Sequence, residues 1–206
     1  MTEQHDTTRF VTLLMLLRMD AEDGVAILEL VKVGQRESSI RAFERGKGHV
    51  PILIRAALLQ RLLMTVTRHH DAAGDVDSLP TLFRLLDEVD IQKTLVSPEL
   101  DEPITFARKR WATLKDDPRV GRLRLFRNRF LAHSISQKWE FERPVFEDVT
   151  STAVDTFAII EALGVATATA PILKHGRQIW KERSEEFWLR LARGAMSNFA
   201  LGRDDK

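Results

Sequence analysis

The hydrophobic positions of this chain repeat at helical spacing almost from end to end. Within residues 8–20, apolar side chains recur at i, i+3, i+4 and i+7, the spacing of an amphipathic helix: Phe10, Leu13, Leu14 and Leu17. A second helix is predicted over residues 23–45, where Gly46 and Gly48 follow and end it. The next stretch, "PILIRAALLQRLLMTVTRHH", is apolar on most sides, which predicts a helix at the centre of the core.

Turn and capping residues divide the rest of the chain into further helices. "DAAGDVDS" is predicted to be a loop, in which Asp77 or Ser78 caps the amphipathic helix "LFRLLDEVDIQ". After a break at "VSPELDEP", a helix is predicted over "ITFARKRWATLK". Asp117 then caps a helix that has Pro118 at its first position. Two long helices, about 145–170 and 172–200, complete the pattern.

Strand patterns are weak throughout, so the sequence predicts an all-α, multi-helix up-down bundle of about six to eight helices. We expect one domain over residues 1–206, with the helix 172–200 packed on the rest. No uninterrupted apolar run reaches the ~18 residues of a membrane span, and "FVTLLMLL" ends at Arg18, which indicates a core helix. We therefore expect a cytoplasmic protein with no membrane partner. Cysteine is absent, which excludes disulfides and thiolate metal sites.

Charge is unevenly distributed behind a net charge of +1. The segment from Arg108 to Lys138 holds ten lysines and arginines against two acids, a net +8, so the remainder of the chain totals −7. A basic segment on an acidic body favours a polyanionic partner, although arginine-rich helices are also commonly just solvated.

The segment "HHDAAGDVD" raises the question of a metal site. Its potential ligands are His69, His70, Asp71, Asp75 and Asp77. Adjacent histidines on a helix diverge by ~100°, and the acids lack the order of a calcium loop. The favoured interpretation is a helix end, with histidines near the negative end of the helix dipole, followed by a capped loop. We therefore expect no metal and no cofactor. The four tryptophans are interpreted as core and interface residues.

The stretch "LRLFRNRFLAHS", residues 123–134, carries the most unusual feature. On a helix, Arg127 falls within the apolar stripe of Val120, Leu123, Phe130 and Leu131. Because burying an unpaired guanidinium costs several kcal/mol or more, Arg127 must pair with an acid, reach water or face a cleft that holds an anion. His133 lies ~120° around the helix and ~9 Å further along.

The same geometry leaves the choice of an anion ligand open. Arg129 precedes His133 by four residues and shares its helical face, so by simple helix geometry it is the better-placed neighbour. Either Arg127 or Arg129 is a candidate phosphate ligand.

Two stretches resemble a known family. "RNRFLAH", with Arg127, Asn128 and His133, is similar to the signature of the HEPN superfamily, in which an arginine and a polar residue precede a histidine by a short spacer. Together with the upstream "AALLQRLLMTVTRHHDAAGDVDSLPTLFRLLDE", it resembles the HEPN family associated with abortive infection of type U, the AbiU2-like family. The resemblance covers about residues 5–170.

The resemblance implies a helical bundle that dimerises across the motif helix and a metal-independent endoribonuclease. By that likeness, His133 is the general acid/base, Arg127 holds the scissile phosphate and Asn128 orients the pair. The basic stretch would guide RNA through these residues: Arg119, Arg122, Arg124 and Arg129. The expected setting is phage defence or a toxin–antitoxin pair, with an antitoxin as partner.

Two other functions stay open. One is a non-catalytic helical dimer that binds RNA or a protein. The other is a structural dimer in which Arg127 is salt-bridged to an acid such as Asp155 or Glu161.

Overall fold

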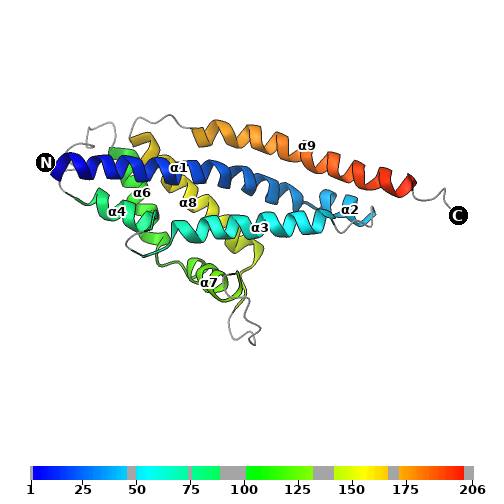
Figure 1. The fold of residues 1–206 in the computed structure, drawn as a ribbon, viewed down its shortest axis with the longest axis horizontal. Coiled ribbons are helices and arrows are strands. Elements are labelled where there is room, and N and C mark those ends of the chain that lie inside the picture. Colours follow the sequence, from blue (N-terminus) through cyan, green and yellow to red (C-terminus); the bar gives the residue numbers. More distant parts are fainter. Residues whose placement is uncertain are drawn as a thin grey trace.

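A computed structural model describes residues 2–45, 50–73, 76–88, 101–131, 142–166 and 172–201. The prediction of an all-α fold is confirmed, since these residues form helices and their connections, with no strand among them (Figure 1). The helices are α1 (Thr2–Gly34), α2 (Glu37–Arg45), α3 (Val50–His69), α4 (Leu79–Leu86), α6 (Asp101–Leu114), α7 (Pro118–Phe126), the π-helical turn η1 (Arg127–Leu131), α8 (Phe146–Ala166) and α9 (Ile172–Leu201).

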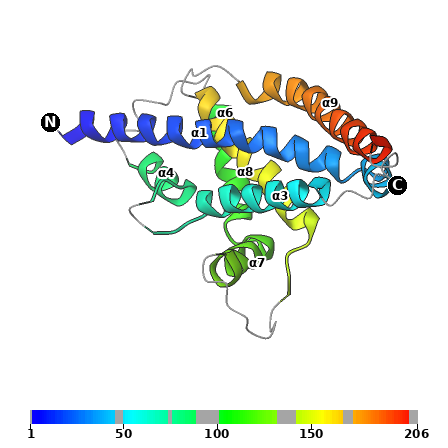
Figure 2. The same cartoon turned by 45° about the vertical axis from the view of Figure 1, so that its right-hand side comes forward.

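Helix α1 runs the length of the bundle and contacts most of the other helices. Helices α9 and α3 lie along opposite sides of α1, and α8 crosses α1 and α3 (Figures 1 and 2). Helix α6 packs on α8, while α7 and η1 lie beyond α3. The motif segment is therefore held against the end of α3 and the start of α8.

One large hydrophobic cluster joins α1, α3, α4, α6, α7 and α8. Its fully buried members include Leu17 of α1, Leu123 of α7 and Phe157 of α8. A smaller cluster forms around Trp188 of α9, whose indole N–H donates a hydrogen bond to the Leu30 carbonyl at 2.7 Å. The interpretation of Trp188 as a core residue is confirmed.

The predicted break between residues 20 and 23 is wrong, because α1 continues without interruption from Thr2 to Gly34. Gly24 lies inside α1. It lies so close to α8 that a Cβ atom there would meet the Phe157 ring inside van der Waals contact. The chain turns instead at Gln35 and Arg36, before α2 begins at Glu37.

Two glycines in helix interiors should respond to alanine in opposite ways. Gly24→Ala is expected to lower the free energy of unfolding by about 1–2 kcal/mol, because overpacking against the buried Phe157 outweighs the better helix propensity of alanine. Gly121→Ala in α7 is the matched control. A Cβ there has open space, so the same change is expected to stabilise the protein by about 0.5–1 kcal/mol. Urea unfolding of both variants measures the difference, and equal shifts would contradict the packing described for Gly24.

Helix α3 is not at the centre of the core, contrary to the sequence prediction. Its outer face leaves Ile52 53% and Leu53 66% exposed, whereas α8 buries most of its apolar side chains. By length and composition alone, α3 and α8 could each cross a membrane. The search of the sequence for an uninterrupted apolar run found neither helix, because polar residues interrupt both. In α8, 61% of that apolar window is buried, as in the core helix of a soluble bundle, against 28% in α3.

Local signals placed several helix ends well. Ser78 occupies the N-cap position of α4, although its hydroxyl bonds to the Thr81 hydroxyl at 3.3 Å rather than to a backbone N–H. Asp117 caps α7 as predicted, since its carboxylate accepts the Arg119 backbone N–H at 2.8 Å. Helix α6 begins earlier than expected, at Asp101, so that Pro103 lies in its first turn rather than in a break.

Candidate functional site

The motif helix changes character at the residue that the sequence marked as unusual. Helix α7 ends at Phe126, and Arg127–Leu131 form a π-helical turn. Such turns pair residues i and i+5, are rare, and are frequent at functional sites. A wider turn separates successive side chains by less than the ~100° of an α-helix. The turn includes Arg129 and ends at Leu131, whereas His133 lies outside the described residues, so the choice between Arg127 and Arg129 as phosphate ligand stays a prediction.

Arg127 is fixed by three neighbours. Its Nη1 donates to Asp71 Oδ2 at 3.2 Å and to the Thr67 carbonyl at 3.4 Å, while its Nε donates to Asn128 Oδ1 at 2.9 Å. The Arg127 side chain is 17% exposed. Its Nη2 makes no hydrogen bond to any residue that the structure describes. Arg127 thus pairs with an acid and still keeps one guanidinium nitrogen for another acceptor.

The acid that pairs with Arg127 is Asp71, not Asp155 or Glu161 as the structural alternative supposed. Asp155 is already shared by Arg110 and Arg119. The correction has a simple cause: Asp71 follows the last turn of α3, which packs against α7 and η1.

Four consecutive residues at the end of α3 hold this region together. Arg68 forms an ion pair with Asp20 of α1, His70 Nε2 lies 2.9 Å from the Thr156 hydroxyl of α8, and Asp71 binds the motif arginine. His69, between them, is fully buried, and its Nε2 lies 3.8 Å from Asp20. The end of α3 therefore ties α1, α8 and η1 to one another.

The two histidines lie at the end of α3, as predicted, and both are buried. Burial lowers the pKa of His69 to about 3, with smaller contributions from Arg68 and His70. Burial also lowers the pKa of His70 to about 4, helped by the positive charge of Arg124. Among the residues that the structure describes, no group of three or more His, Asp or Glu side chains could hold a metal ion.

Of the proposed catalytic set, Arg127 and Asn128 are adjacent and bonded to each other, and Asn128 is exposed. His133 lies outside the described residues, as do its neighbours from 132 to 141. The described geometry of the candidate site is therefore that of Arg127, Asn128 and their neighbours.

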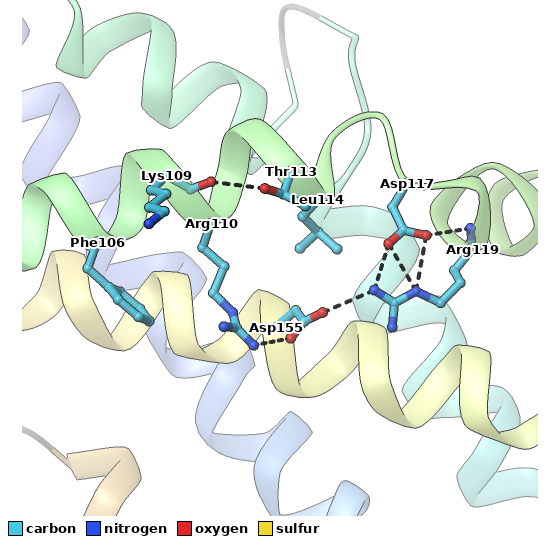
Figure 3. A pocket seen from close by; sticks show the side chains of 8 residues that line it. All are labelled: Phe106, Lys109, Arg110, Thr113, Leu114, Asp117, Arg119 and Asp155. Atoms are coloured by element: carbon cyan, nitrogen blue, oxygen red, sulfur yellow. Dashed lines mark hydrogen bonds and ion pairs between the residues drawn. The ribbon is translucent and has the colours of Figure 1, made fainter.

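Two of the arginines predicted to guide RNA are engaged in ion pairs. Arg119 donates Nε to both Asp117 oxygens at 3.0 Å, and Nη2 to Asp117 at 2.6 Å and to Asp155 at 3.2 Å (Figure 3). Its Nη1 donates to Ser151 at 2.6 Å. The hydrogen bonds from Arg119 hold the pKa of Asp117 below its usual range. This network leaves Arg119 few donors for a phosphate.

Arg122 is held in the same way. Its Nε and Nη2 donate to the two oxygens of the buried Asp148 at 3.2 and 2.7 Å, and these bonds lower the pKa of that carboxyl. Arg124 is half-buried and makes no ion pair with a described residue, and Arg129 is exposed on η1. The predicted basic surface is thus divided between structural arginines and two that reach the surface of α7 and η1.

The sequence matches the profile of one family over most of its length. The HEPN AbiU2 profile, described as AbiU2, covers residues 20–191. The chain belongs to the AbiU2 family of HEPN proteins. No curated protein and no solved structure gave a match to the chain.

Membership of the AbiU2 family confirms the resemblance and connects the chain to abortive infection and to a ribonuclease type of function. The matched region begins within α1 and ends within α9, so the AbiU2 fold in this chain reaches beyond the expected limit near residue 170.

Sequence reasoning missed Asp71 as the partner of Arg127 and considered it only as a metal ligand. An arginine on an apolar stripe does signal that an acid is near, but the two residues are 56 positions apart in the sequence. Only the packing of α3 against the motif brings them together in this AbiU2 protein.

Proposed function

We propose that this AbiU2-family protein is a metal-independent endoribonuclease of the HEPN type, acting in the cytoplasm in phage defence or as the toxin of a toxin–antitoxin pair. The observation that carries the proposal is the state of Arg127. Its guanidinium is held by Asp71, Asn128 and the Thr67 carbonyl, while Nη2 has no acceptor among the described residues. A cation fixed in advance with unused donors is suited to a phosphate.

The reaction requires a base, an acid and a stabilising cation. His133 would take the proton of a ribose 2′-OH, so that this oxygen attacks the adjacent phosphorus and forms a 2′,3′-cyclic phosphate. The P–O5′ bond breaks, and a protonated imidazole returns a proton to the leaving 5′-oxygen. Arg127 would offset the charge that builds on the phosphoryl oxygens.

The neighbours of Arg127 have positioning roles in this proposal. Asn128 Oδ1 accepts a hydrogen bond from Nε and Asp71 accepts one from Nη1, so the plane of the guanidinium is set before RNA arrives. A homodimer across the motif helix would bring a second Arg127–His133 pair to the same phosphate chain, one histidine serving as base and the other as acid.

RNA cleavage in the presence of excess EDTA tests the proposal. The purified chain is expected to cut single-stranded RNA under these conditions and to leave 2′,3′-cyclic phosphate ends, which phosphatase resistance and mass spectrometry identify. Expression in bacterial cells is expected to arrest growth. Cleavage only after addition of a divalent cation, or no cleavage by a folded protein, would contradict the proposal.

A second function is favoured by the same ion pair. Because Asp71 lies 3.2 Å from Arg127, it offsets part of the charge that a scissile phosphate needs. This arrangement supports a non-catalytic helical dimer that binds RNA or a partner protein, such as an antitoxin. RNA retention that is unchanged by His133→Ala, with no cleavage by either form, would favour this alternative.

A further inference from the structure

A hollow of about 420 Å³ opens between α6, the start of α7 and α8, on the side of the Arg119 network (Figure 3). Its α6 wall is built from one face of that helix. Phe106, Lys109, Arg110 and Thr113 stand at positions i, i+3, i+4 and i+7, which share one side of an α-helix. Ile104 and Ala107 of α6 are buried in the core, and the buried Leu114 also lines the hollow.

The hydrogen-bond donors of the two cations on this wall, Lys109 and Arg110, mostly have no acceptor among the described residues. Arg110 has five N–H groups, yet Nη2, bound to Asp155, is its only nitrogen with an acceptor among the described residues. Its Nε is buried without an acceptor there, and its Nη1 makes no hydrogen bond. Lys109 is exposed and makes no ion pair with a described residue. By contrast, Arg119 on the far wall uses all three of its nitrogens within the protein.

An exposed aromatic ring completes the wall. Phe106 is 46% exposed, and the guanidinium carbon of Arg110 lies 5.9 Å from the centre of its ring. A flat ring beside cations is the combination that holds single-stranded nucleic acid, because a base stacks on the ring while the cations meet the phosphate. Three cations line the hollow against two carboxylates, so its charge favours an anion.

We propose that this hollow is a subsite for a nucleotide of single-stranded RNA, with the base on Phe106 and the phosphate at Lys109 and Arg110. The ligand class rests on the proposed function. Arg119 of α7, at the edge of the hollow, and Arg127, the first residue of η1, are eight residues apart, ~12 Å along the helix axis, so one short strand can reach both places. The subsite therefore grips the RNA beside the cleavage site rather than at it.

RNA binding by matched variants tests the subsite. The variants Phe106→Ala and Lys109→Ala are compared with Phe187→Ala and Lys181→Ala on α9, where Phe187 is 40% exposed and Lys181 is also exposed. All four are made in full-length His133→Ala protein, and circular dichroism verifies that each is folded. The probe is a labelled single-stranded RNA oligonucleotide. Arg110 is left intact because its removal would also disturb Asp155.

The expected result is specific to α6. Phe106→Ala should weaken RNA binding about 5- to 100-fold, and Lys109→Ala should reduce the salt dependence of log K by about 0.7, the loss of one phosphate contact. Both α9 controls should bind like the parent. In protein that retains His133, the α6 variants should raise KM and leave kcat unchanged.

The outcomes separate this inference from the proposed activity. Cleavage by both α6 variants with unchanged KM would overturn the subsite and leave the nuclease standing. Binding that depends on Phe106 without any cleavage would overturn the nuclease and leave the subsite. If an acidic peptide displaces the RNA equally well whether or not Phe106 is present, the hollow is a general anion surface and the subsite is overturned.

Discussion

The Arg127→Ala variant is expected to cleave RNA about 10²- to 10³-fold more slowly than the unmodified chain, the loss that follows removal of one fixed donor to a developing oxyanion. The physical reason is the fixed guanidinium, whose Nη2 is the part that no described residue uses. The loss should fall mainly on kcat, because the charge on the phosphoryl oxygens grows in the transition state. Single-turnover cleavage of a labelled RNA measures it.

His133→Ala is the companion variant and should lose about 10²- to 10⁴-fold, the range for a general acid/base. RNA binding by this variant should persist. Arg127→Lys keeps the charge but presents a point donor instead of a planar fork, so it should recover only part of the activity. Cleavage by Arg127→Ala at the rate of the unmodified chain would place the chemistry elsewhere in the protein.

Stability must be measured alongside, since Arg127 also holds Asp71. Removing Arg127 leaves a carboxylate that is partly in contact with water, so we expect a loss of about 1–3 kcal/mol in unfolding free energy. Asp71→Asn separates the two roles of the acid. If Asp71 mainly positions Arg127, cleavage falls in this variant. If it mainly offsets the positive charge of Arg127, RNA binds more tightly to the variant, and this result favours the non-catalytic alternative.

The helices and their caps were accessible from the sequence because their signals are local. Asp117 followed by Pro118 fixes the start of α7 within a few residues. The wrong break between residues 20 and 23 has a non-local origin. Helix α1 continues there to Gly34, with Gly24 packed against Phe157 of α8.

The same distinction applies to the candidate site. The stripe around Arg127 was sufficient to predict that this arginine needs an acid or an anion, because the energetic argument concerns one helix. Which acid pairs with Arg127 depends on how α3 packs against the motif segment. Asp71 could therefore not be identified from the sequence as its partner. The π-helical turn could not be predicted from the sequence either, because the analysis of hydrophobic spacing assumes the α-helical period at every residue.

Acid should destabilise the protein well before its carboxylates are protonated. We expect the free energy of unfolding to fall by about 4 kcal/mol between about pH 7.5 and about pH 5, roughly 2 kcal/mol for each of the buried histidines His69 and His70. Their native pKa values are lowered to about 3 and about 4, below the value of 6.5 for a solvated imidazole. The unfolded chain therefore binds two protons in a range where the folded chain binds none.

Stability is complete above about pH 6.5 and is lost as the pH falls, because protons stabilise only the unfolded state until the native pKa values are reached. The lowered pKa values of Asp117 and Asp148 act in the same direction, but only below the range where solvated aspartates titrate, near pH 4. The interval from about pH 5 to 7.5 thus isolates the histidines. Denaturant unfolding at several pH values within it gives the slope.

Replacing the two histidines distinguishes this cause from general acid sensitivity. His69→Leu with His70→Gln should flatten the pH dependence whatever its effect on stability at neutral pH, because the readout is a slope. Since Asp71 follows His70 directly, loosening of the end of α3 would release Arg127 as well. RNA cleavage that declines with the circular dichroism signal below pH 6.5, and recovers at pH 5 in the double variant, would trace acid inactivation to these histidines. An unchanged slope in that variant would show that they do not carry the acid sensitivity.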